Sequence, residues 1–160
     1  MERAERVGQL LLARGWRGSV AEATAGGLIS AALLKVAGAS RFYERGIVAY
    51  SKAAKLDTLG MPPYLYNAQG SVHREAVQAM AEGARRLGQS QVGVAESGVA
   101  GPGAGSSGLP LGTVWAAVVT PDGAIQRELH LPGNRGEVME GIVDAVLAML
   151  EEALTPGHAA

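Results

Sequence analysis

The sequence predicts an α/β fold, a three-layer α/β/α sandwich with a mixed sheet. Short apolar segments alternate with amphipathic helical segments over residues 1–95, which is typical of parallel strands joined by helices. Two further strand-like segments flank Pro121-Asp122-Gly123 and predict an antiparallel hairpin over 112–131. The length of 160 residues fits a single domain, which we place at 1–160 with a frayed tail at 155–160.

Apolar spacing and capping residues define the elements in order. Val7 and Leu11 give residues 2–14 one apolar face, and Gly15 ends that helix. A short apolar strand at 17–22 runs into a glycine turn, and a helix at 26–37 follows, with Gly38 as its C-cap. We expect helices at 2–14, 26–37, 52–59, 72–88 and 135–153, and strands at 17–22, 46–50, 91–95, 112–120 and 124–131.

The middle of the chain continues the alternation. The strand at 46–50 is apolar and is expected to be buried, after a polar link at 40–45. Ser51 can cap the helix at 52–59, and the prolines after Met61 prevent its continuation. Ser71 is expected to cap the long helix at 72–88.

The last third holds a loop, the hairpin and a final helix. A glycine-rich loop at 97–108 separates the strand at 91–95 from the hairpin. Asn134 and Glu137 have the spacing of a capping box, which opens the helix at 135–153.

Composition excludes several classes of protein. Cysteine is absent, so no disulfide or thiolate metal site can form, and the histidines (His73, His130, His158) lack ligand spacing. We therefore expect no metal and no cofactor. The net charge of -1 and the 4% aromatic content argue against a nucleic-acid partner. The charged start and the lack of a long apolar segment predict a soluble, cytoplasmic protein with no membrane partner.

Two strand ends resemble each other. Val20-Ala21-Glu22 and Val94-Ala95-Glu96 each place an acid at the end of a strand, before a glycine-containing turn. Ligands of open α/β sheets bind at the carboxyl ends of strands, so both turns are expected to line one pocket. Free N–H groups at the start of the helix after Gly26 would favour an anion there. The alternative is that the glycines only permit tight turns and the acids cap helices or face water.

Other candidates lie near these turns. Gly103 to Gly108 formally matches G-x-G-x-x-G, but a strand follows it instead of a helix, so we reject a dinucleotide site. Tyr50 and Lys55 could reach a strand-end pocket, where a desolvated lysine can act as a base. Composition alone favours a surface position for Lys55. Arg135 could bind a phosphate or carboxylate, or equally be a solvated residue at a helix start.

Taken together, several segments resemble the C-terminal domain of the CinA competence/damage-inducible family, also known as a stand-alone nicotinamide mononucleotide deamidase. They occur in family order over nearly the whole chain. The matching segments are Ala21-Glu22-Ala23-Thr24-Ala25-Gly26-Gly27, Gly46-Ile47-Val48-Ala49-Tyr50-Ser51 with Ala54-Lys55 and Leu59-Gly60, Gly98-Val99-Ala100-Gly101-Pro102-Gly103 with Gly112-Thr113-Val114, and Asn134-Arg135.

The resemblance implies hydrolysis of the carboxamide of nicotinamide mononucleotide to give nicotinate mononucleotide and ammonia. In such an enzyme a serine in the first glycine turn attacks, with Tyr50 and Lys55 matching the residues of proton transfer. Ser97 matches a residue that positions the substrate, and Arg135 matches one that meets the phosphate. The remaining expected substrate-binding residues are Glu22, Gly26, Gly101 and Gly103. The family also implies a homodimer, for which the hairpin at 112–131 offers an edge.

This sequence departs from the family motif at the nucleophile. The family motif usually reads Ala-Glu-Ser-Cys-Thr-Gly-Gly. In this sequence Ala23 occupies the serine position and Thr24 occupies the cysteine position. Glu96 also adds a charge that would repel a phosphate. Three hypotheses follow: an amidohydrolase that uses Thr24 or a lysine-activated water, a non-catalytic nucleotide-binding or interaction protein, or a changed reaction with Glu22 and Glu96 as a carboxylate pair. The residues favour the second, because a methyl group cannot attack a carbonyl.

Overall fold

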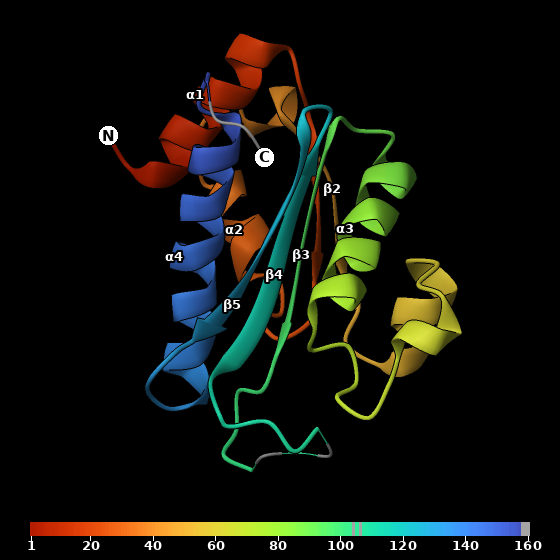
Figure 1. The fold of residues 1–160 in the computed structure, drawn as a ribbon. Coiled ribbons are helices and arrows are strands. Elements are labelled where there is room, and N and C mark those ends of the chain that lie inside the picture. The colour runs from red at the N-terminus through yellow and green to blue at the C-terminus, as the bar shows by residue number, and fades with distance from the viewer. Residues whose placement is uncertain (104, 106, 158–160) are drawn as a thin grey trace.

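A computed structural model describes residues 1–103, 105 and 107–157. Within them the strands form one mixed sheet in the order β2-β1-β3-β4-β5 (Figure 1). β1 pairs in parallel with β2 and β3, whereas β3–β4 and β4–β5 are antiparallel. The predicted mixed sheet and hairpin are confirmed. The strands are β1 (Gly18–Glu22), β2 (Tyr43–Val48), β3 (Val92–Gly98), β4 (Thr113–Thr120) and β5 (Gly123–His130).

Helices cover both faces of the sheet, as predicted. α1 (Arg3–Arg14), α2 (Leu28–Leu34) and α4 (Arg135–Leu154) lie on one face, and α3 (Arg74–Gly88) lies on the other (Figure 1). Shorter helical turns are η1 (Ala39–Arg41), η2 (Ala54–Thr58) and η3 (Pro63–Leu65). None of the described helices is long and apolar enough to cross a membrane.

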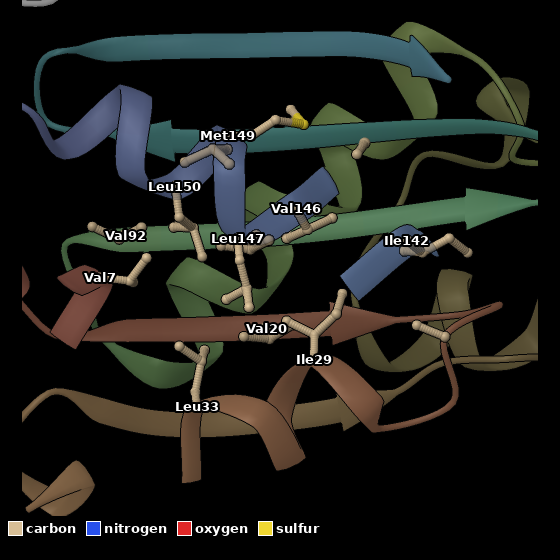
Figure 2. Packing of buried hydrophobic residues seen from close by; sticks show 14 of the residues in the cluster. Val7, Val20, Ile29, Leu33, Val92, Ile142, Val146, Leu147, Met149 and Leu150 are labelled. Atoms are coloured by element: carbon tan, nitrogen blue, oxygen red, sulfur yellow. The ribbon is translucent and has the colours of Figure 1, made fainter. Parts of the chain in front are cut away.

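Each face of the sheet has its own apolar core. Val20 of β1 packs among aliphatic residues of α1, α2 and α4, such as Ile29 and Ile142 (Figure 2). Its neighbour Ala21 points to the opposite face and joins an alanine-rich cluster against α3. Because successive side chains of β1 point to opposite faces, this strand contributes to both cores. β1 leads directly into the first glycine turn.

The start of α4 is built by the predicted capping box. The Glu137 N–H donates to Asn134 Oδ1 at 2.9 Å, and the Asn134 N–H donates to Glu137 Oε1 at 3.0 Å. This reciprocal pair fixes the first turn of α4, where Arg135 is the first helical residue.

The β2 prediction was wrong in its bounds and its burial. The strand runs from Tyr43 to Val48, so it takes in part of the predicted link, and all six of its residues are exposed or half-buried. β2 is an edge strand, which leaves one side of it open and gives Val48 an exposed fraction of 54%. An apolar sequence alone does not distinguish an edge strand from a central one.

Two cap predictions were also wrong. α2 ends at Leu34, and Gly38 instead precedes η1. α3 begins at Arg74 after His73, while the hydroxyl of Ser71 hydrogen-bonds Ser97 Oγ at 2.7 Å. Ser51 does cap its helical turn, since its Oγ accepts the Ala54 N–H at 3.1 Å.

The third strand is longer than predicted. β3 extends to Gly98 because its antiparallel pairing with β4 continues through Glu96, Ser97 and Gly98. Residues 158–160 of the predicted tail, including His158, lie outside the described residues, as do Ala104 and Ser106 of the glycine-rich loop.

Candidate functional site

A cleft of about 290 Å³ lies at the carboxyl ends of β1 and β3. The turns after both strands line it, as expected for an open α/β sheet. The turn after β1 contributes Ala23 and Thr24, and the end of β3 with the segment that follows it contributes Ser97 to Gly101. Further walls come from Tyr50, Lys55, residues of the 66–72 segment, and Arg135 at the start of α4.

Glu22 lies beneath this cleft instead of facing it. Its side chain is 1% exposed, and it is not among the described lining residues, nor is Gly26. Its carboxylate accepts the N–H groups of Gly27, Ile29 and Ser30 at 3.1, 2.9 and 2.9 Å. The donors at the start of α2 that we expected to be free for an anion are therefore occupied by the protein's own carboxylate.

Glu96, on the neighbouring strand β3, also accepts three backbone N–H groups. It lies opposite Glu22 in the register of β1 and β3 and is fully buried. Its carboxylate accepts the N–H groups of Ala23, Ala25 and Thr24 at 2.8, 2.8 and 3.2 Å. It does not line the cleft, so the expected repulsion of a ligand phosphate does not act by direct contact.

Burial is the largest influence on the pKa of Glu96. Desolvation, reinforced by the charge of Glu22, raises the pKa of Glu96 to about 7, although the three N–H donors of the turn lower it. The turn after β1 is thus held by a carboxyl group that titrates near neutral pH.

Ala23 and Thr24 present little reactive chemistry to the cleft. Ala23 lines it with a methyl group and is 4% exposed. The Thr24 hydroxyl donates to the Gly98 carbonyl at 3.0 Å and accepts the Gly98 N–H at 2.9 Å. Thr24 therefore joins the two strand-end turns, and its proton is already engaged.

Lys55 is buried, which corrects the surface position that composition favoured. Its exposed fraction is 6%, and it lines the cleft from η2. Burial lowers the pKa of Lys55, while attraction by Glu96 opposes that shift. Lys55 Nζ lies 5.8 Å from the centroid of the Tyr66 ring, which also lines the cleft.

Arg135 faces the cleft and is held on two sides. Its Nη1 donates to the Gly101 carbonyl at 2.7 Å, and its Nη2 donates to the Tyr50 hydroxyl at 3.3 Å. Tyr50 itself is 64% exposed. The capping box of α4 and these two bonds orient a guanidinium that keeps further N–H groups for an anion.

Sequence reasoning placed most of the described lining but missed part of it. Ser97, Gly101 and Gly103 line the cleft as expected. Ser71 and Tyr66 were missed, because Ser71 has the position of a helix cap and Tyr66 lies in a segment without periodicity. No group of three or more potential metal ligands occurs among the described residues.

The chain is thus an open α/β domain with a polar cleft at the ends of its strands. Residues 1–154 match the family model described as "CinA C-terminal domain", and the chain belongs to this family. Among its relatives is a protein of Desulforamulus reducens named for competence-damage induction, 43% identical over 148 residues. A CinA-like protein of Syntrophus aciditrophicus is 40% identical over 154 residues.

These relatives are longer proteins. The alignments cover 92% and 96% of this chain but only 36% and 37% of the relatives, so the chain spans about a third of their length. Solved structures match over nearly their whole length. A CinA superfamily protein from Klebsiella pneumoniae is 34% identical with a TM-score of 0.91, covering 95% of each chain. A competence/damage inducible protein from Agrobacterium tumefaciens is 33% identical with a TM-score of 0.85, covering 96% of each.

Proposed function

We propose that this domain binds a pyridine nucleotide of the nicotinamide mononucleotide class in the cleft and does not hydrolyse its amide by a serine mechanism. The observation that carries the proposal is the methyl group of Ala23 in a cleft whose charged lining residues, among those described, are Lys55 and Arg135. The ligand class comes from the family resemblance, and the loss of hydrolysis comes from the residue at position 23.

Charge and size support an anionic nucleotide. Two cations and no carboxylate occur among the described lining residues, so the cleft favours an anion. A volume of about 290 Å³ is at the lower end of the range for small-molecule sites. Arg135, oriented by Gly101 and Tyr50, is suited to a phosphate.

Three features argue against an efficient amidase. Ala23 offers no nucleophile, and the Thr24 hydroxyl is bound to the Gly98 backbone at both its donor and acceptor sites. The N–H groups of Ala23, Thr24 and Ala25 donate to Glu96, so they are not available to an oxyanion. Loss of the nucleophile in a serine hydrolase costs about 10⁶ in rate.

A second candidate is hydrolysis by a water that Lys55 activates. The buried position of Lys55 favours it, since burial lowers the pKa of its ammonium toward that of a useful base. Reaction by a Glu22–Glu96 pair is not supported, because neither carboxylate is among the described residues that line the cleft.

Ammonia release from nicotinamide mononucleotide separates these candidates. We expect none above background from the wild type and a measurable gain in Ala23→Ser that disappears in Ala23→Ser/Lys55→Met. Ala25→Ser is the matched control, because it adds the same hydroxyl two residues away at a position outside the described lining. Ammonia release by the wild type, lost in Lys55→Met, would establish the water mechanism and overturn the proposal.

A further inference from the structure

We propose that Lys55 is a carboxylate-binding residue, so that the cleft prefers a pyridine nucleotide whose ring carries a carboxylate over the corresponding amide. This inference rests on the proposed function and names the ligand within that class. It assigns to the cleft the acid form of the nucleotide instead of the amide that a deamidase would consume.

The first support is that the ammonium of Lys55 has no protein partner among the described residues. The side chain is 94% removed from solvent, yet within the described part of the chain its Nζ makes no hydrogen bond or ion pair. Its Nζ lies 5.8 Å from the centroid of the Tyr66 ring. The Nζ atom is not fully enclosed and is reached from the cleft, so an anionic group of a ligand can pair with it there.

The second support is that the nucleophile position offers Lys55 no hydroxyl proton to remove. A lysine base in a serine amidase takes the proton of the attacking hydroxyl, but Ala23 has none. The Thr24 proton is held by the Gly98 carbonyl at 3.0 Å. Lys55 is therefore left with the chemistry of a cation and hydrogen-bond donor.

Glu96 supports the charge of Lys55 without pairing with it. Both oxygens of Glu96 accept N–H groups of the turn at Ala23, Thr24 and Ala25. Attraction by Glu96 nevertheless raises the pKa of Lys55 against the effect of burial. The charge of Glu96 thus favours the ammonium form of Lys55 against the larger effect of burial, and the N–H groups of Lys55 remain available in the cleft.

The two cations of the cleft come from different elements and suit a ligand with two anionic groups. Arg135 projects from α4 and is bound to Gly101 and Tyr50, whereas Lys55 projects from η2. With a phosphate at Arg135, a ring carboxylate can accept charge-assisted hydrogen bonds from Lys55. An amide offers that ammonium only a neutral oxygen.

Calorimetric titration with nicotinic acid mononucleotide and nicotinamide mononucleotide tests this assignment at one salt concentration. We expect the wild type to bind the acid about tenfold more tightly, as a charge-assisted bond compared with a neutral one. Lys55→Met should reduce the ratio of the two dissociation constants to within about twofold. Arg135→Met should weaken both nucleotides by similar factors and keep the ratio.

Lys52→Met is the matched control. Lys52 Nζ also lies over the Tyr66 ring, at 5.2 Å, but Lys52 is exposed and not among the described lining residues, so its loss should leave the ratio unchanged. Equal binding of the two nucleotides, or a preference that survives in Lys55→Met, would overturn the inference and leave the proposed function intact. Binding of neither nucleotide would overturn both.

Discussion

Glu22 and Glu96 occupy equivalent places and hold different structures. They lie opposite each other in β1 and β3, both are buried, and each accepts three backbone N–H groups. In both cases one carboxylate oxygen takes two donors and the other takes one. Glu22 satisfies the start of α2 within its own β–α connection, whereas Glu96 reaches across to the turn after the neighbouring strand.

The difference separates a local cap from a long-range support. The N–H donors to Glu22 follow it by five to eight residues, so these hydrogen bonds need only the local connection from β1 to α2. The donors of Glu96 lie 71 to 73 residues away and require the sheet to be assembled. We therefore expect loss of Glu22 to destabilise the fold, and loss of the Glu96 charge to alter mainly its pH dependence.

Glu22→Ala tests the structural half of this comparison and should have the largest effect. It leaves three N–H groups at the start of α2 without acceptors, which we expect to cost about 4 kcal/mol of unfolding free energy. Urea denaturation measures the loss. Glu22→Gln is the matched control, because its amide oxygen can keep the two bonds to Gly27 and Ile29. A loss below about 1 kcal/mol in Glu22→Ala would contradict the role of Glu22 as a cap.

Glu96→Gln tests the pH dependence. Glu96 has a pKa of about 7 in the folded protein and 4.5 as the reference, so the folded state binds more protons between these values. Wild-type stability, relative to Glu96→Gln, should therefore be highest below pH 4.5 and fall by roughly 3 kcal/mol as the pH rises to 7. Urea denaturation of both proteins across this range measures the difference. A difference that does not vary with pH would contradict the raised pKa.

Thr24→Val should have the smallest effect of the three. It removes the two hydrogen bonds with the Gly98 backbone while Glu96 still holds the Thr24 N–H. We expect a loss of about 2 kcal/mol, since two polar backbone groups lose their partner. Thr24→Ser retains the hydroxyl and should lose less in the same measurement. A loss in Thr24→Val larger than in Glu22→Ala would show that Thr24, not the carboxylates, dominates the strand-end turns.

Local signals predicted most of the fold. The Asn134–Glu137 capping box and the cap of Ser51 depend on residues three apart, and both form. Predictions failed where a distant strand decides the outcome. β2 is exposed because it lies at the edge of the sheet, and Ser71 bonds Ser97 across the cleft instead of capping α3.

The same limit applied to the candidate site. Strand ends and glycines were enough to predict that two turns share a cleft, but for Arg135 the sequence left a solvated position at a helix start equally open. They could not show that both glutamates point beneath the turns, since an acid at a strand end can equally face a ligand. The burial of Lys55 was likewise hidden, because it depends on residues distant in sequence that share the cleft with it, such as Tyr66 and Ser97.

The packing of α1 against α4 has a consequence for how such a domain can be joined to others. The start of α1 and the end of α4 lie near each other, where Arg3 and Arg6 both pair with Glu151 (Figure 1). β1 and β3 run away from that end, so the turns after them, which line the cleft, lie at the opposite pole of the sheet (Figure 1). A polypeptide joined before α1 or after α4 therefore attaches to an element end remote from the cleft.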